Sequence, residues 1–84
     1  MSTAAARALR LVARVDALWE NGPPARGVVA EIDDEGEIFF RVSALRLTCE
    51  RCGISIPQSR SRISREARAA WLTHHVACPP REPR

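Results

Sequence analysis

The stretch Cys49-Glu50-Arg51-Cys52-Gly53 places two cysteines two residues apart and follows them with a glycine. This spacing lets two sulfur atoms reach one ion at about 2.3 Å, and the glycine permits the tight turn that the chain then makes. Further residues of metal-binding type, His74-His75 and Cys78, follow 21 residues later. Cysteine and histidine in this arrangement are the ligands that Zn2+ prefers. We therefore predict one structural zinc ion held by four side chains, Cys49, Cys52, His74 and Cys78.

The histidine is the open choice in this ligand set. Residues four apart lie one above the other on a helix, so His74 and Cys78 can reach the same ion, but residues three apart, His75 and Cys78, can do so too. We favour His74 because it continues the inward-facing stripe of Ala67 and Ala70. A set of four protein ligands leaves no position for water, which indicates a structural and not a catalytic site.

Other interpretations of the cysteines remain. An odd count of three cysteines argues against a disulfide framework. A thioredoxin-type redox pair would need the start of a helix after Cys52, whereas a glycine-containing loop is expected there. An iron–sulfur cluster with one histidine ligand, or cysteines without metal, would also use these residues. Zinc is favoured because four ligand types occur at finger-like spacing in a short chain.

Residues 49–78 resemble a zinc-finger module with Cys-Cys-His-Cys ligands, in which a knuckle is followed by a loop and by a helix carrying the last two ligands. The resemblance covers about a third of the chain and implies metal binding. The gap between knuckle and histidine is longer than in the common nucleic-acid finger, and the last ligand is Cys78 in place of histidine. A helix that reads a DNA groove is therefore not implied. Residues 1–48 resemble no family.

Local patterns predict a single α+β domain over residues 1–84. Apolar residues at helical spacing predict a helix over Thr3–Glu20, within a segment 1–22 that Asn21-Gly22-Pro23-Pro24 ends. Alternating residues predict a β-hairpin over 27–48, with a turn at 33–36 and a second strand, Glu37–Thr48, bent near Ser43-Ala44. The zinc module occupies 49–78: a loop over Gly53–Arg62, then a helix capped by Ser61 or Ser64 and running to Ala77. Residues 79–84 form a tail.

Charge is segregated: residues 1–26 carry +2, residues 27–50 carry −4 and residues 51–84 carry +5. The basic part contains a row of arginines suited to phosphate contacts, interleaved with serines. We predict DNA binding, in regulation, through Arg60, Arg62, Arg65 and Arg68. A second row follows the first helix, at Arg7, Arg10 and Arg14. The acidic hairpin would repel a nucleic-acid backbone, so the binding face has to exclude it.

The competing function is a protein-interaction adaptor, with Trp19 as a candidate anchor and core packing as its alternative role. An enzyme is not expected, because no pair of catalytic side chains stands out and a chain of 84 residues offers little pocket volume for a small-molecule substrate. No apolar run reaches membrane-spanning length, and no signal peptide is apparent. We expect a cytoplasmic protein. Thirteen arginines with no lysine indicate a GC-rich bacterium or a phage.

Overall fold

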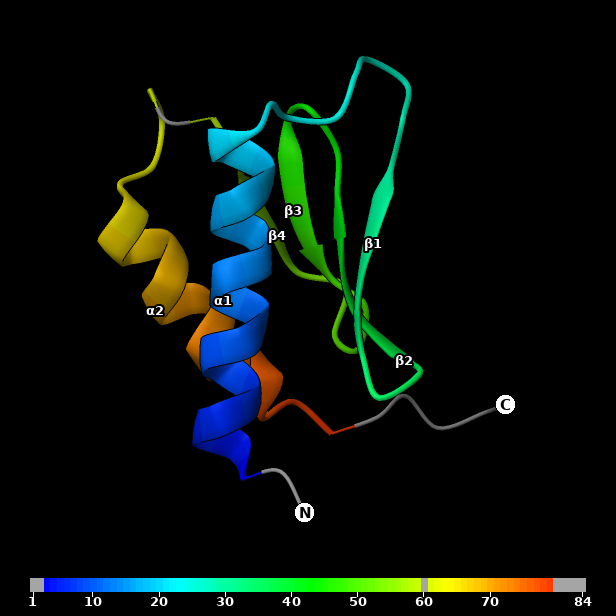
Figure 1. Cartoon of the computed structure of the whole chain (residues 1–84), viewed down its shortest axis with the longest axis vertical. Coiled ribbons are helices and arrows are strands. Elements are labelled where there is room, and N and C mark those ends of the chain that lie inside the picture. The colour runs from blue at the N-terminus through cyan, green and yellow to red at the C-terminus, as the bar shows by residue number, and fades with distance from the viewer. Residues whose placement is uncertain (1–2, 60, 80–84) are drawn as a thin grey trace.

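The computed structural model describes residues 3–59 and 61–79. Its elements are, in order, α1 (Ala4–Glu20), β1 (Ala30–Asp34), β2 (Glu37–Val42), β3 (Arg46–Cys49), β4 (Ser55–Pro57) and α2 (Arg65–Val76). The strands form one antiparallel sheet in chain order, and both helices lie on the same side of it (Figure 1). The predicted α+β class, with a helix, a hairpin, a knuckle and a second helix, is confirmed.

The first helix has the boundaries that its sequence predicts. The Thr3 hydroxyl accepts a hydrogen bond of 3.0 Å from the backbone N–H of Ala6, which caps the start of α1. Asn21 caps its end, and Gly22 then adopts a φ of 112° that favours glycine. The face of α1 that points to the sheet is apolar and buried, and its central residues are Ala8, Leu11 and Val15.

The hairpin between β1 and β2 closes through a two-residue turn. Asp34 pairs with Glu37, and the residues between them, Glu35 and Gly36, have φ angles of 52° and 79°. Positive φ at both central positions is the geometry that matches the twist of an antiparallel hairpin. The predicted turn is therefore present, and it projects several carboxylates from one end of the sheet.

The single bent strand predicted over Glu37–Thr48 is wrong, because the chain reverses there. The backbone N–H of Ser43 donates to the carbonyl oxygen of Arg46 at 2.9 Å, and the Ser43 hydroxyl accepts from the Arg46 N–H at 3.0 Å. A serine that bonds its own turn in this way stabilises a reversal where a strand would otherwise continue. The predicted loop over Gly53–Arg62 likewise contains a strand, β4, which pairs with β3.

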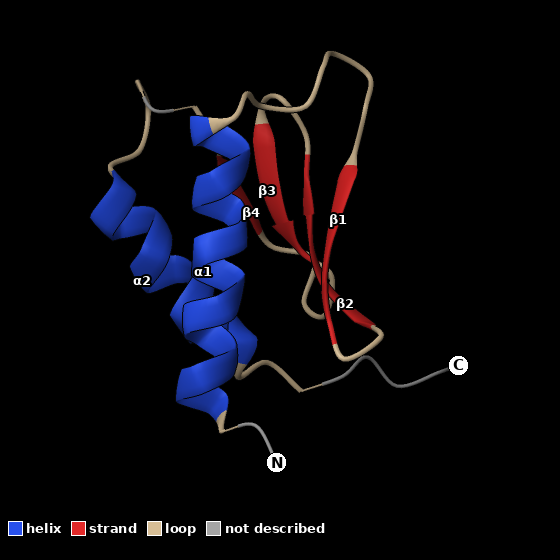
Figure 2. Cartoon of the chain, in the orientation of Figure 1, coloured by secondary structure: helices blue, strands red, loops and turns tan. Residues whose placement is uncertain are grey.

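The core lies between the sheet and the helices (Figure 2). The buried apolar residues of the strands and of α2 are Ile32, Phe39, Phe40, Val42, Leu47, Cys49, Leu72 and Val76. One predicted ligand, Cys49, is thus itself part of the core and fixes the end of β3 against the helices. The opposite face of the sheet carries no helix among the described elements.

Candidate metal centre

Three parts of the chain bring metal-binding side chains to one point. Cys49 ends β3, Cys52 lies in the turn that follows, and His75 and Cys78 come from the end of α2. One potential ligand atom from each of the four residues lies within 4.8 Å of every other. The structure therefore contains a Cys-Cys-His-Cys cluster positioned for one metal ion.

The distances within the cluster fit a tetrahedral ion. The Nδ1 atom of His75 lies 3.3 Å from the Sγ of Cys52 and 3.3 Å from the Sγ of Cys78. Bond lengths of about 2.3 Å to sulfur and about 2.0–2.1 Å to nitrogen place sulfur and nitrogen about 3.5 Å apart on a tetrahedral edge. The close approach of Nδ1 to both sulfurs identifies it, and not Nε2, as the ligand atom of His75.

The knuckle has the local geometry that its sequence predicts. The N–H of Gly53 donates to the carbonyl oxygen of Cys49 at 2.9 Å, and the N–H of Cys49 donates to that of Ile54 at 2.9 Å. Gly53 has a φ of 81°, which a side chain would oppose. The N–H of Glu50 also donates to the carbonyl oxygen of Phe39 at 3.0 Å, so β2 holds the turn in place.

The structure brings His75, and not the preferred His74, to the three cysteines. His74 is exposed, whereas His75 is 7% exposed and shares the buried side of α2 with Leu72. The preference for His74 relied on an inward-facing stripe with Ala67 and Ala70, but both of these residues are exposed, so that side of α2 faces solvent. In addition, α2 ends at Val76, before Cys78. The next turn is tighter, because the N–H of Cys78 donates to the carbonyl oxygen of His75 at 3.1 Å. Residues three apart eclipse each other in such a turn, so Cys78 stands over His75.

Aromatic neighbours orient the His75 ring. The ring of Trp71 lies 4.2 Å from that of His75 between centroids, and Phe40 packs on Trp71 at 5.6 Å. Burial lowers the pKa of His75, and the nearby His74 lowers it further. A neutral imidazole is the form that binds a metal, so this environment prepares the ligand. No signal in the sequence indicated this contact between Trp71 and the ligand.

The crowded thiols have opposing pKa shifts in the absence of metal. For Cys78, burial and then the nearby Cys49 raise the pKa to about 11. Burial also opposes ionisation of Cys52, but hydrogen bonds from the Ile54 backbone and from neighbouring thiols outweigh it, so the pKa of Cys52 is lowered. Both residues would hold a metal ion as thiolates, so metal binding would release the proton of the Cys78 thiol.

Arg51, between the two knuckle cysteines, supports the centre from outside the ligand set. Its guanidinium donates to the carbonyl oxygen of Cys78 at 2.9 Å and pairs with the carboxylate of Glu37. It also lies 4.3 Å from the centre of the Phe39 ring. One side chain thus connects the knuckle, the last ligand and the hairpin. The sequence shows only that Arg51 lies between two cysteines, and this position did not predict its contacts.

The predicted DNA-contacting arginines do not form one exposed row. Arg68 is 2% exposed and pairs with Asp16 at 2.6 Å, so it is not available to a backbone phosphate. Arg65 is exposed but pairs with the same carboxylate at 3.2 Å. Arg62 is exposed as predicted, and Arg60 lies outside the described residues.

The second arginine row, on α1, binds the acidic hairpin. Arg10 and Arg7 each lie 2.9 Å from a carboxylate oxygen of Asp34, and Arg14 lies 2.9 Å from Asp33. The hydrogen bond from Arg10 and then that from Arg7 outweigh the effect of burial and lower the pKa of Asp34 from 3.8 to about 2. The hairpin charge that was expected to repel nucleic acid is therefore compensated within the protein.

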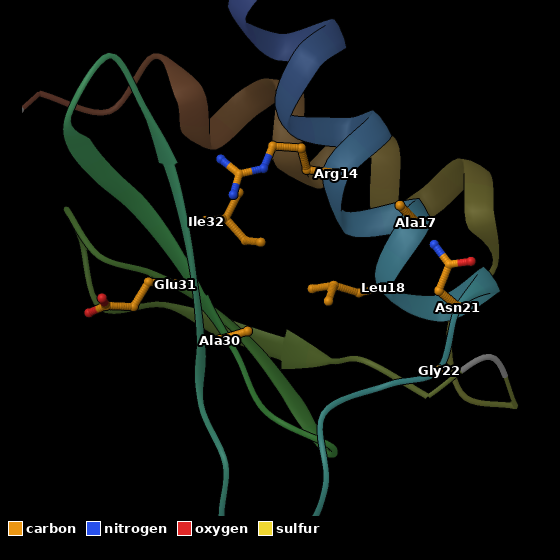
Figure 3. Close-up of a pocket in the computed structure, with 8 residues that line it drawn as sticks. All are labelled: Arg14, Ala17, Leu18, Asn21, Gly22, Ala30, Glu31 and Ile32. Atoms are coloured by element: carbon orange, nitrogen blue, oxygen red, sulfur yellow. The ribbon is translucent and has the colours of Figure 1, made fainter.

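A hollow of about 350 Å³ lies between the end of α1 and β1 (Figure 3), and no residue of the metal cluster is among its described lining residues. Leu18 points toward the sheet, whereas the carboxylate of Glu31 points away from the helix. The lining is mainly apolar at its centre and contains no histidine or cysteine; it consists of Arg14, Ala17, Leu18, Asn21, Gly22, Ala30, Glu31 and Ile32. This lining is suited to binding an apolar group more than to catalysis.

No protein-family model, no curated protein and no solved structure matches this chain. The assignment of the Cys-Cys-His-Cys cluster as a metal site is therefore based on its geometry alone. Within the described residues, no helix combines the length and the apolar character that crossing a membrane requires.

Proposed function

We propose that this chain is a small DNA-binding protein whose fold is stabilised by one structural zinc ion. The observation that carries DNA binding is the pairing of the acidic hairpin with the protein's own arginines, at Arg7, Arg10, Arg14, Arg41 and Arg51. This pairing removes the repulsion that would have opposed a nucleic-acid backbone, and the chain still carries a formal charge of +3. Positive surplus charge supports sequence-independent attraction to phosphate.

The donor set supports zinc and a structural role for it. Three thiolates and one imidazole in a closed tetrahedral set are typical of structural zinc sites, whereas a catalytic zinc keeps a position open for water. The proposal is accordingly a binding role in regulation and not an enzymatic one. The three cysteines form no disulfide, and cysteines that stay reduced suit a reducing compartment, which supports the cytoplasm as the location.

A binding measurement tests the proposal. Zinc-loaded protein is titrated into a labelled DNA duplex of mixed sequence, and fluorescence anisotropy is recorded at two salt concentrations. We expect binding at low salt that weakens as salt rises, because counterions compete for the phosphates. An unchanged anisotropy at low salt, with zinc bound and the protein folded, would contradict DNA binding.

The second candidate, a protein-interaction adaptor, is favoured by one surface. β1 is an edge strand, and Val28 and Val29, just before it, are 52% and 51% exposed. The hollow between α1 and β1 adjoins this edge, and an extended segment of a partner can add to such a strand and place a side chain there (Figure 3). A pull-down from nuclease-treated lysate, compared with the Val29→Asp variant, tests it. A partner that both proteins capture equally would exclude this surface.

A further inference from the structure

The described arginines fall into two groups. Seven of them form ion pairs with carboxylates: Arg7, Arg10, Arg14, Arg41, Arg51, Arg65 and Arg68. Among the residues that the structure describes, Arg26, Arg46 and Arg62 have no carboxylate partner, and all are exposed. Unpaired guanidinium groups are the ones that a phosphate can bind without first displacing a carboxylate.

Arg46 and Arg62 line the same hollow, of about 380 Å³. Arg46 begins β3 and Arg62 precedes α2, so the fold and not the sequence brings them together. The other described residues of the lining carry no negative charge; they are Leu45, Pro57 and Ser59. The Arg46 guanidinium donates one hydrogen bond, of 3.2 Å, to the Ser55 hydroxyl, and its remaining N–H groups have no partner in the described part of the chain. The Arg62 side chain forms no hydrogen bond within residues 3–59 and 61–79.

We propose that this hollow, the Arg46–Arg62 groove, binds the phosphodiester backbone of nucleic acid; this inference rests on the proposed DNA-binding function. Guanidinium groups present donors in a planar fork that fits phosphate oxygens. Leu45, which is 68% exposed, and Pro57 provide an apolar surface beside the charges, against which a sugar can pack. The volume falls within the range of ligand pockets, roughly 300–1,000 Å³.

The groove differs from the arginine face predicted from sequence. A neighbouring hollow at the start of α2 is lined by Arg65 and Arg68, but Asp16 already binds both of these side chains. The α2 face therefore presents a compensated charge, and the Arg46–Arg62 groove presents an uncompensated one. Of the predicted residues that the structure describes, Arg62 alone belongs to the proposed site, and Arg46 is new.

Arg46 also indicates the path that the nucleic-acid backbone follows beyond the groove. It lines a second hollow of about 230 Å³, on the face of the sheet that the helices leave open, together with Val29, Arg41, Ser43 and Thr48. Hydroxyl groups there can donate to further phosphate oxygens. Among the residues placed by the structure, no aromatic side chain lines either hollow, so these residues offer bases no stacking platform. Contacts to phosphates carry no sequence information, so recognition through this surface is independent of base sequence.

The experiment compares two variants that remove arginines from exposed positions. Zinc-loaded wild type, R46A/R62A and R26A are titrated into a labelled duplex of mixed sequence at about 50 mM and about 200 mM salt. Arg26 is the matched control, because it is also exposed and without a carboxylate partner but lies in the loop before β1, outside the groove. Melting curves and zinc content verify that each variant is folded.

We expect R46A/R62A to weaken binding on the order of 100-fold at the lower salt concentration and R26A to leave it close to wild type. Two phosphate contacts with a slope of about −0.9 each also predict that wild-type affinity falls about 12-fold more than that of the double variant over this fourfold rise in salt. If R46A/R62A were to disturb the turn through the lost Ser55 contact, R62A alone should still lower the affinity and reduce the slope by about one.

Two negative results are distinguishable. Wild type that binds the duplex, with R46A/R62A and R62A binding equally well and with the same salt slope, would overturn the groove and leave DNA binding to another surface. Wild type that is folded and zinc-loaded but does not bind at either salt concentration would overturn the groove and the proposed function together.

Discussion

The two helices are attached to the sheet by different kinds of interaction. α1 buries a continuous apolar stripe and adds arginine–carboxylate pairs to the hairpin. α2 buries two apolar residues, Leu72 and Val76, against three in α1, and its end is joined to the knuckle by the metal-binding cluster. A domain of this size has little apolar area to spare. The comparison indicates that the ion supplies for α2 what packing supplies for α1.

The largest expected effect comes from removing a ligand without disturbing the core. Cys52 is suited to this because it is exposed, so Cys52→Ala removes a thiolate and leaves no cavity, whereas Cys49 is fully buried. Structural zinc contributes about 10–16 kcal/mol of apparent binding free energy in finger peptides, which is as large as the whole stability of a small domain. We expect C52A to lose bound zinc and the cooperative melting of α2, measured by metal content and circular dichroism.

The adjacent histidines provide a matched pair for the same measurement. His75→Ala should lose zinc as C52A does, because its Nδ1 faces two sulfurs, and His74→Ala should keep both zinc and the melting transition because its side chain is exposed. Zinc retained by H75A but lost by H74A would contradict the ligand assignment. A cooperative transition in C52A with no zinc bound would contradict the dependence of α2 on the ion.

A smaller effect is expected at the contact between the two helices. Arg68 of α2 is 2% exposed and lies 2.6 Å from the Asp16 carboxylate of α1. Removal of one partner from a buried pair leaves an uncompensated charge and costs about 3–5 kcal/mol. We expect Asp16→Asn to destabilise the zinc-loaded protein by about this amount in urea unfolding. An unchanged urea midpoint would show that Arg68 does not need its partner.

The metal-binding part of the molecule was the easier part to predict. Fixed spacing identifies Cys49 and Cys52, and Ser64 accepts from the Ala67 N–H at 3.0 Å as a helix cap should. The histidine could not be assigned from sequence, because the choice depends on where α2 ends and how tightly the next turn is wound. A shift from α-helical to tighter spacing exchanges His74 for His75.

The arginines show why the proposed interface was harder to predict. Arg62, Arg65 and Arg68 look equivalent in sequence, since they are three apart on one flank of a helix. Their roles differ because Asp16, from a distant part of the chain, binds two of them. The unpredicted strand β4 and the reversal between β2 and β3 bring Arg46 close to Arg62. Partners from distant segments are decided by tertiary structure, which a local pattern does not contain.

The smallest expected effect separates the exposed ion pairs of α1 from the buried pair of α2. Arg10→Ala removes one of the two arginines on Asp34, and the remaining Arg7 pair still compensates that carboxylate. The pKa of Asp34 lies below its unfolded value of 3.8, at about 2, so the contribution of its pairs is fully present at neutral pH and is lost as the pH falls through that range. Salt screens exposed charges much more than buried ones. Urea unfolding at pH 7 with saturating zinc should therefore show a slight destabilisation by R10A that disappears at about 1 M salt, whereas the cost of D16N persists. A cost of R10A that equals that of D16N, or that is insensitive to salt, would mean that α1 depends on its ion pairs as α2 depends on the metal.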